Sequence, residues 1–517
     1  MRGLPSAGSV VVLTIGGAIA AGFAALFSAA GGPTSVVPIG AYLARVVAFS
    51  LAQATLSTAL ATAFGAALAV ALSRRRFPGR GLYLAGLGAA AVMPAIVVVF
   101  ATVDVFGRGG WLGALSARTG VSIFGWPGIL FAHVLLNAPF VARVMLDALG
   151  TVPAEHWRLA QALGFGPLAV ARHLDWPVLR AELAGVASLV FLLCFTSFAI
   201  VLTLGGGRAT LEVAIYEALR VDLDYGRAAW LGLLQVAICL CVALALGRLF
   251  ARAPPATTHR PAVPRPDRDD RRLAVLDALV LVLGAALVGP PLLSVAAGWR
   301  AIPAVVDPDF GGALATSLGI AALSAALSVG FAAAIAASVR RLRRAPAGAR
   351  LARLYESVPT LVLAMPPFAL AAGLYLLVRR VADPALVGYG LLPAVNALSA
   401  LPFVYRFVAP AMALASERYA RLADLLDLTG LVRFRIVDWP LLRRPLSAAA
   451  AMAMALSFGD FGVVALFGGS ELRTLPYLLY ERLGSYRLEE ASAIGLVLML
   501  AAFLLAYGSA RWSHAAR

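Results

Sequence analysis

The sequence predicts an all-α polytopic membrane protein. Of its 517 residues, 61% are hydrophobic and only 13% are charged, whereas soluble proteins carry about 25% charged residues. Apolar runs recur along the whole chain, and they are long enough to cross a bilayer core of about 30 Å, which takes roughly 20 helical residues. The chain is therefore expected to form about 12 transmembrane helices.

The apolar runs fall into two sets of six, and each run is expected to form one transmembrane helix. They cover residues 10–30, 45–73, 82–106, 121–149, 182–205 and 227–249, then 274–298, 312–338, 357–378, 391–415, 446–468 and 489–510. The first run follows Arg2 as in a signal peptide, but it exceeds the 7–15 apolar residues typical of one, so we expect a retained helix. Pro94 and the pair Pro366 and Pro367 are expected to kink the third and ninth spans, because proline cannot continue a helix interior.

The two sets contain matching hydrophilic stretches. The segment RLAQALGFGPLAVARHLDWPVLR at 158–180 aligns without a gap with RLADLLDLTGLVRFRIVDWPLLR at 421–443, and 11 of the 23 positions are identical. TLEVAIYEAL at 210–219 matches TLPYLLYERL at 474–483 at nearly the same offset. Two matches in the same order indicate one unit written twice. Because six spans return the chain to the same side of the membrane, the two six-helix repeats are expected to be parallel.

We therefore predict a first unit over residues 1–250 and a second unit over residues 273–517. The stretch between them, ARAPPATTHRPAVPRPDRDDRR at 251–272, is rich in proline and arginine and lacks hydrophobic periodicity. Such a composition is typical of a flexible linker, here expected on the cytoplasmic side. A translocation path is expected between the two halves.

The net charge of +17 is interpreted as orienting the protein in a membrane, and no nucleic-acid partner is expected. All 43 basic residues are arginines. With a cytoplasmic N-terminus, about 30 of them fall in cytoplasmic segments and many acids fall in outer ones, which is the positive-inside pattern. The three cysteines lie in predicted spans and the five histidines do not cluster, so neither a disulfide framework nor a metal site is expected.

The matching hydrophilic stretches are predicted to lie on the cytoplasmic face. In the first stretch, apolar residues at helical spacing and a terminating proline indicate a short amphipathic helix outside the bilayer. The stripe comprises Leu159, Ala160, Leu163, Phe165 and Leu168. A helix resting on membrane lipid and a loop packed on its own bundle are alternatives. Two related copies favour a docking surface, since a twofold-symmetric partner needs two equivalent contacts.

Each stretch resembles the EAA loop of ATP-binding-cassette (ABC) importer permeases, which has an acidic residue, an alanine, a glycine and a hydrophobic-x-x-Pro ending. The first copy matches at Glu155, Ala160, Gly164 and Leu174 through Asp175 to Pro177, and the second at Glu417, Ala423 and Val437 through Asp438 to Pro440, with Asp427 in the glycine position. The resemblance implies the fold of type I ABC importer permeases, in which coupling helices, here at 155–177 and 417–440, dock on two copies of an ABC ATPase subunit.

ATP hydrolysis is expected on that partner chain. A P-loop requires a lysine to hold the phosphates, and this sequence has no lysine. ATP and magnesium are therefore expected on the ATPase. This chain is expected to have no cofactor and no catalytic residue, and to be a transport subunit and not an enzyme.

Further stretches extend the resemblance over nearly the whole chain, most closely to the fused two-unit permeases of thiamine importers. They are CFTSFAIVLTLGG at 194–206, LEVAIYEALRVDLDYGRAA at 211–229, SFGDFGVVALFGG at 457–469 and RTLPYLLYERLGSYR at 473–487. The resemblance implies uptake of thiamine or thiamine phosphates across a bacterial inner membrane, from a periplasmic or extracellular binding protein. An iron(III) permease of the same architecture is the nearest alternative, followed by an ion-driven secondary transporter and a membrane enzyme.

Four polar residues in the spans are candidates for the translocation path. Thr196, Ser197 and Ser457 occupy comparable places in the fifth and eleventh spans, where small polar residues also serve close helix packing. Asp460 is a charge inside a predicted span, and such a charge usually faces a path or a partner. It is expected either to attract a cationic thiazolium or to pair internally, with Arg406 as the candidate partner.

Three acids in the outer segments are candidates for docking the binding protein. Glu212 and Glu217 belong to the first TLxxxxYExL segment, and Glu481 belongs to the second. The alternative for these segments is a solvated loop without a partner.

Overall fold

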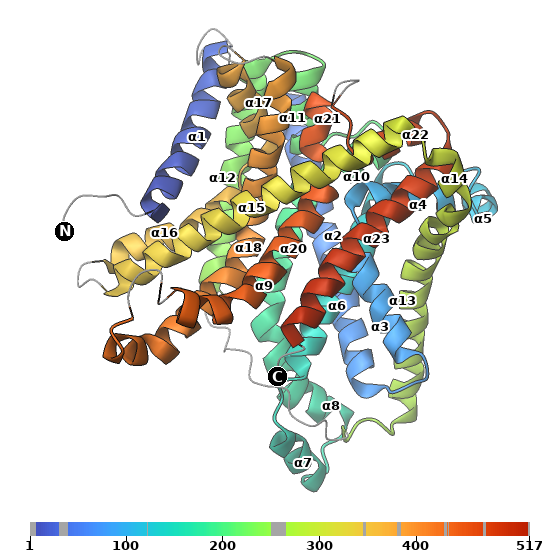
Figure 1. The fold of residues 1–517 in the computed structure, drawn as a ribbon. Coiled ribbons are helices and arrows are strands. Elements are labelled where there is room, and N and C mark those ends of the chain that lie inside the picture. Colours follow the sequence, from blue (N-terminus) through green and yellow to red (C-terminus); the bar gives the residue numbers. More distant parts are fainter. Residues whose placement is uncertain are drawn as a thin grey trace. The chain divides into compact units, whose positions relative to one another are not determined.

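The computed structural model describes residues 7–29, 40–120, 122–249, 265–344, 348–379, 384–428, 432, 434–468 and 472–514. Within these ranges every regular element is a helix (Figure 1), which confirms the predicted all-α class. In the described part of the chain, ten helices are long and apolar enough to cross a membrane, and two bent helix pairs bring the number to 12 if each pair is one span. The chain is a multi-pass membrane protein.

The twelve expected spans each coincide with one of these helices or helix pairs. In the first half they are α1 (Ala7–Ala29), α2 (Ala41–Arg74), α3 (Arg80–Ala91) with α4 (Ala95–Phe106), α6 (Trp126–Leu149), α9 (Trp176–Phe195) and α12 (Tyr225–Leu249). In the second half they are α13 (Arg271–Ala297), α15 (Pro308–Arg344), α16 (Ala349–Leu363) with α17 (Pro367–Val378), α18 (Pro384–Leu425), α20 (Trp439–Phe458) and α23 (Leu488–His514).

Short helices connect the spans. They are α5 (Gly113–Thr119), α7 (Ala154–Ala162), α8 (Pro167–Val170), the π-helix η1 (Ala171–Asp175), α10 (Ala199–Leu204), α11 (Leu211–Arg220), the 3-10 helix η2 (Gly298–Ala301), α14 (Ile302–Val305), the π-helix η3 (Phe434–Asp438), α21 (Gly462–Phe467) and α22 (Leu475–Gly484).

Prolines break the third span of each half. The axes of α3 and α4 differ by 112° and those of α16 and α17 by 97°. Pro94 directly precedes α4, and Pro366 directly precedes α17. A proline lacks the N–H that the preceding turn would bind and its ring clashes with that turn, so the expected kinks at these prolines are confirmed and are sharp breaks.

The helices form two compact units that differ from the two sequence halves. One, here called the C-unit, contains α1, nearly all of α11, the start of α12 and the helices from α14 onwards, and the other, the N-unit, contains α2 to α10 and α13. In the C-unit α1 packs on α15 and α17, and in the N-unit α13 packs on α2, α3 and α4. The first span of each half is thus held by helices of the other half. The division at 251–272 into two repeats stays a prediction, and residues 250–264 lie outside the described ranges.

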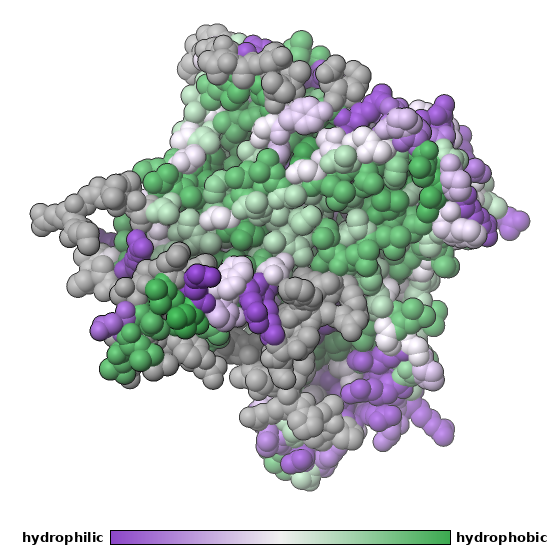
Figure 2. All heavy atoms as spheres, in the orientation of Figure 1, coloured by the Kyte–Doolittle hydropathy of each residue, from purple (hydrophilic) through white to green (hydrophobic). Residues whose placement is uncertain are grey.

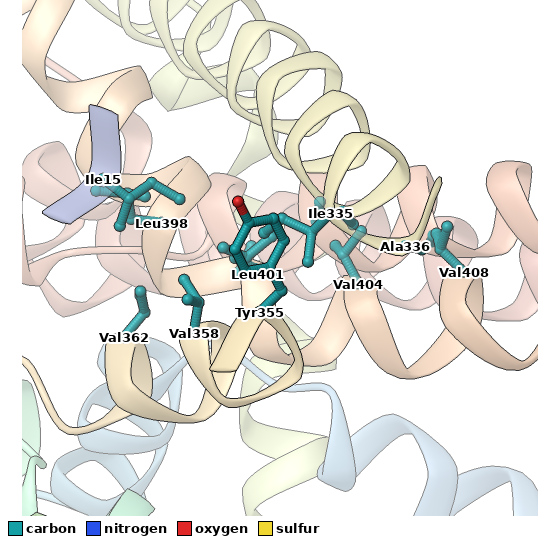
Figure 3. Packing of buried hydrophobic residues seen from close by; sticks show 14 of the residues in the cluster. Ile15, Ile335, Ala336, Tyr355, Val358, Val362, Leu398, Leu401, Val404 and Val408 are labelled. Atoms are coloured by element: carbon teal, nitrogen blue, oxygen red, sulfur yellow. The ribbon is translucent and has the colours of Figure 1, made fainter. Parts of the chain in front are cut away.

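The core of the C-unit lies between α1, α15, α16, α18 and α20. Ile335, Tyr355, Leu401 and Val404 are each 7% exposed or less and point toward one another (Figure 3). By contrast, the outer faces of α15 and α23 carry mainly hydrophobic side chains (Figure 2), including Leu323 at 50% and Leu504 at 65% exposure. Large apolar surface on long helices is typical of a face in contact with lipid.

The repeated TL motifs have the same structural role in both halves of the sequence. The backbone N–H of Leu211 at the start of α11 donates to the Ser50 hydroxyl at 2.9 Å, and that of Leu475 at the start of α22 donates to the Ser317 hydroxyl at 2.8 Å. The first N–H groups of a helix have no partner within the helix. A buried serine on the second span of each half therefore caps a short helix, α11 in the first half and α22 in the second.

Candidate functional site

The first predicted coupling loop folds as a sequence of short helices at one end of the N-unit (Figure 1). It begins with α7, turns at Gly164, and continues through α8 and η1 directly into α9. Gly164 has a φ of 64°, in the left-handed region that costs other residues roughly 1–2 kcal/mol. Pro177 is at the first turn of α9, where its missing N–H is not needed.

The loop has a buried face and an exposed apolar face. Val152, Trp157 and Val170 form a small buried cluster, whereas Leu159, Leu163 and Leu168 are 57%, 60% and 82% exposed. The prediction of a single apolar stripe from Leu159 to Leu168 is wrong, because Ala160 is buried and Phe165 packs on the buried cluster. The turn at Gly164 ends the periodicity of α7, so residues on either side no longer share one helical face.

Asp175 at the end of η1 is held by an arginine from the segment between the two halves. Arg265 Nη1 and Nη2 donate to its two carboxylate oxygens at 2.9 and 2.7 Å. Both side chains are at most 6% exposed, and the guanidinium lies 4.7 Å from the Trp157 ring centroid. Arginine forks match carboxylates in this way, and the geometry fixes orientation as well as charge.

The position of Arg265 corrects one expectation. The prediction of a flexible linker over residues 251–272 is wrong for its last part, because Arg265 and Asp267 are buried and Asp270 caps α13, which begins at Arg271. The segment from Arg265 to Arg272 is therefore fixed by ion pairs and a helix cap. Composition alone does not reveal this, because it does not show which charges find partners.

The second predicted coupling loop shares two backbone features with the first. Asp427, in the glycine position, has a φ of 49°, again left-handed, and the π-helix η3 precedes α20 as η1 precedes α9. Leu425 and Leu426 beside this turn are 81% and 60% exposed. The side chains of Glu417 and Ala423 and part of the segment 429–433 lie outside the described residues.

The other predicted loop residues that the structure describes lie near the beginning or the end of the two coupling loops. Glu155 is exposed in the first turn of α7, and Pro440 lies in the first turn of α20, as Pro177 does in α9. Asp438 is buried, and its carboxylate lies 3.8 Å from Arg340 Nη1. This distance allows electrostatic attraction and exceeds that of a hydrogen bond.

Ser457 belongs to a buried polar cluster that joins three spans of the C-unit. Its hydroxyl accepts from the Asn396 side chain on α18 at 3.0 Å and donates to the Ser324 hydroxyl on α15 at 3.0 Å. In the N-unit, Asn137 on α6 similarly contacts Cys194 Sγ at 3.6 Å, at the position equivalent to Ser457. Internal hydrogen bonds of this kind hold transmembrane helices together, which favours the packing role for Ser457.

Thr196 and Ser197 lie just beyond the end of α9. The Thr196 hydroxyl donates to the Leu192 carbonyl in the last turn of α9 at 2.9 Å, and the side chains of Thr196 and Ser197 are partly exposed. They follow Cys194 closely in the chain, so they lie near the contact between Asn137 and Cys194 in the N-unit but are not part of it. Their contact with a cargo stays a prediction.

Asp460 lies at the break between α20 and α21. Its Oδ1 accepts from the Gly462 N–H at 3.2 Å, and its Oδ2 is buried without a hydrogen-bond partner among the described residues. Arg406, the candidate for an internal pair, has an exposed side chain and forms no ion pair with Asp460 in the described structure. The expected alternative of a pair with Arg406 is therefore not supported.

The three outer acids differ in their surroundings. Glu212 is 1% exposed and accepts a hydrogen bond from Gln235; burial raises its pKa to about 8 although this bond lowers it. A buried carboxyl group cannot meet a docking protein at the surface, so Glu212 does not fit that role. Glu217 is partly buried, and Glu481 is 37% exposed and 3.9 Å from Arg473. These two remain docking candidates.

Several residues that hold the loops and spans are not among the candidates predicted from the sequence. Arg265 and Trp157 brace the first loop, and Asn137 and Asn396 form the polar clusters. An asparagine within each fourth-type span is a usable signal, since polar residues in spans usually face a partner. Among the described residues, no group of three or more histidines, cysteines or acids could hold a metal ion.

The chain is similar over almost its whole length to known thiamine transport system permeases. It is 39% identical to the ThiP protein of Escherichia coli over 506 residues, which is 96% of this chain and 94% of that protein. The chain belongs to this permease family. It is also 38% identical to ThiP of Brucella melitensis over 496 residues, 93% of this chain and 90% of the relative. With ThiP of Haemophilus influenzae the identity is 34% over 477 residues, 90% and 88% of the two chains.

This membership confirms the resemblance to the fused permeases of thiamine importers and the assignment as a transport subunit, not an enzyme. No family model matches the chain. The long apolar helices and the family together describe a membrane permease.

Proposed function

We propose that this chain is the membrane-spanning subunit of an ABC importer that carries thiamine or a thiamine phosphate across a bacterial inner membrane. The observation that carries the proposal is the similarity to thiamine permeases over more than nine-tenths of the chain. The nearest alternative, iron(III), prefers hard oxygen ligands. Its uptake is one outcome of the test below.

Two ATPase subunits drive transport from the cytoplasmic side in this proposal, and ATP and magnesium bind there. The first coupling loop supports this with three exposed leucines, Leu159, Leu163 and Leu168, on a base fixed by buried ion pairs. Interfaces are centred on apolar residues that become fully desolvated. Leu425 and Leu426 offer a corresponding apolar surface on the second loop.

The connection from each loop to its span supports a mechanical role. η1 continues into α9 without a break, and η3 continues into α20. A displacement of either loop by the ATPase is therefore passed to the fifth span of its half. ATP binding then favours one of two arrangements of the permease because it binds that arrangement more tightly, and hydrolysis restores the other.

A cationic cargo is supported by the surroundings of Asp460. A Cβ atom at position 462, where the chain has glycine, would lie 3.4 Å from Asp460 Oδ1 and 3.6 Å from the Phe368 ring, so the acid and the aromatic ring both border Gly462. The ring centroids of Phe368 and Tyr216 are 5.8 Å apart, and those of Phe461 and Tyr480 are 4.8 Å apart. Aromatic faces attract cations, and a thiazolium is a cation.

The proposed orientation has a cytoplasmic N-terminus and an outer face that receives the binding protein. The distribution of arginines supports it, since cytoplasmic loops of membrane proteins collect basic residues. Glu217 and Glu481 are the proposed contacts for the binding protein, because their carboxyl groups are not fully buried.

Uptake by the reconstituted transporter tests the proposal. The full chain, its ATPase and its binding protein are placed in proteoliposomes, and uptake of labelled thiamine is followed with and without ATP. ATP-dependent thiamine accumulation is expected. Uptake by the chain alone on an ion gradient, or ATP-dependent uptake of labelled iron(III) in place of thiamine, contradicts it. In the same assay, an Asp460→Asn variant that folds poorly but transports normally assigns Asp460 a structural role.

A further inference from the structure

The guanidinium of Arg265 is saturated with hydrogen bonds. Besides its two bonds to Asp175, its Nη1 donates to the Ser73 hydroxyl at 3.0 Å, and its Nε and Nη2 donate to the two oxygens of Asp267 at 3.0 Å each. A guanidinium has five N–H groups, so every donor of Arg265 is used. The side chain is 6% exposed. Because all five N–H groups of this buried side chain are hydrogen-bonded, its position is fixed.

The same network extends to two spans. Arg74 at the end of α2 binds Asp267 at 2.8 Å and Asp277 of α13 at 3.1 Å, and Arg75 binds Asp277 at 2.7 Å. Burial opposes ionisation of the Asp267 carboxyl, but hydrogen bonds and charges from Arg265 and Arg74 outweigh it and lower its pKa.

Three arginines and three aspartates therefore neutralise one another at the base of the first coupling loop. Buried charges are strongly destabilising when one partner is removed. The network thus ties the loop to the end of α2 and the start of α13.

The second coupling loop lacks an equivalent brace among the described residues. Asp438 is the counterpart of Asp175, and one of its carboxylate oxygens is buried without a hydrogen-bond partner in the described structure. Its contact with Arg340 is 3.8 Å long. Among the described residues, a forked arginine–aspartate contact at this position is present on the first loop.

We propose that Arg265 is a positioning residue for coupled transport, because it holds the first coupling loop rigid and joins it to α2 and α13. The inference rests on the proposed function, in which this loop receives the movement of an ATPase. Displacement of the first loop is thereby passed to α2 and α13 as well as to α9, into which η1 continues.

The ratio of ATP hydrolysed to thiamine transported tests this role in the reconstituted complex. Arg265→Ala is expected to raise the ratio by about 2- to 30-fold, which corresponds to the effect of changing residues of a coupling network. Arg268→Ala is the matched control: this nearby side chain is exposed, and its backbone carbonyl, which binds Arg75, is retained. The control is expected to keep the wild-type ratio.

The outcomes separate this inference from the proposed function. Without ATP-driven thiamine uptake by the wild-type complex, the proposed function fails. If wild-type uptake is coupled and Arg265→Ala lowers hydrolysis and uptake together at an unchanged ratio, Arg265 is merely structural and the inference fails. Asp438→Ala, at a residue whose contact with Arg340 is 3.8 Å long, is expected to change the ratio less than Asp175→Ala, and equal effects contradict a special role of the Arg265–Asp175 pair.

A second measurement is independent of transport and of complex assembly. Hydrogen exchange of the purified full chain is expected to be faster at backbone amides 157–175 in Arg265→Ala than in Arg268→Ala. Arg265→Lys, which keeps the charge but loses the fork, is expected to lie between wild type and Arg265→Ala. Equal protection of this segment in all variants overturns the bracing role.

Discussion

Gly164 and Asp427 adopt the same left-handed backbone conformation at equivalent positions of the two coupling loops, with φ values of 64° and 49°. The second loop therefore turns as the first does, although its residue at this position differs. Aspartate is one of the residues that tolerate this region, because its short polar side chain can bind the local backbone. The substitution therefore preserves the turn.

The left-handed turn predicts that substitution destabilises the first loop at position 164 but is tolerated by the second loop at position 427. Gly164→Ala is expected to cost about 1–2 kcal/mol, and the cost comes from the backbone alone, because a side chain at 164 would meet no atom within 4 Å. Asp427→Gly is expected to leave the second turn intact. Hydrogen exchange of amides in each loop measures this, and the first substitution is expected to speed exchange about 5- to 30-fold. Equal exchange in Gly164→Ala and wild type contradicts a left-handed backbone conformation at Gly164.

The exposed leucines predict a loss of ATPase binding without a loss of folding. Leu168→Asp and Leu425→Asp are each expected to weaken binding of the ATPase about tenfold or more, as truncation of a central apolar contact does. Because these side chains are 82% and 81% exposed, the thermal unfolding midpoint is expected to stay unchanged. Tyr486→Asp, at a site 90% exposed outside both loops, is the control. Pull-down of the ATPase at increasing salt measures binding. Undiminished binding in both leucine variants excludes the exposed leucines as the docking surfaces for the ATPase.

The twelve spans and the breaks at Pro94 and Pro366 were predictable because apolar length and proline chemistry act locally. The brace on Asp175 was not predictable, because Arg265 lies 90 residues away in sequence and no local pattern distinguishes it from its neighbouring arginines. The same limit explains Glu212: its place in the TLxxxxYExL segment suggested a surface acid, and only the packing of α11 shows that it is buried. Pairing between distant polar residues is decided by tertiary structure.

The cluster around Ser457 predicts a role in packing. Ser457→Ala leaves the buried Asn396 amide without its acceptor, which is expected to destabilise the protein by about 1–3 kcal/mol. Ser447→Ala on the same helix is the control, since the Ser447 hydroxyl is exposed and binds its own helix. Thermal unfolding followed by tryptophan fluorescence measures the difference. Unchanged stability with reduced thiamine uptake per folded molecule supports the translocation path in place of packing.

Glu212 predicts a pH-dependent loss of stability. Burial raises its pKa from 4.5 to about 8, so between these values the folded chain retains a proton that the unfolded chain has released. Stability therefore falls as the pH rises through this window, and each pKa unit corresponds to about 1.4 kcal/mol. Glu212→Gln keeps an acceptor for Gln235 and removes the titrating group.

The variant is therefore expected to unfold at a higher temperature than wild type at pH 7.5, by an amount equivalent to about 1 kcal/mol or more, and the difference is expected to shrink as the pH falls toward 4.5. The measurement is the unfolding midpoint in detergent across this pH range. Glu481→Gln, where the side chain is 37% exposed and lies near Arg473, is the matched control on the repeated motif. A pH-independent difference between Glu212→Gln and wild type contradicts a buried, protonated Glu212, because only a titrating group makes the difference follow the pH.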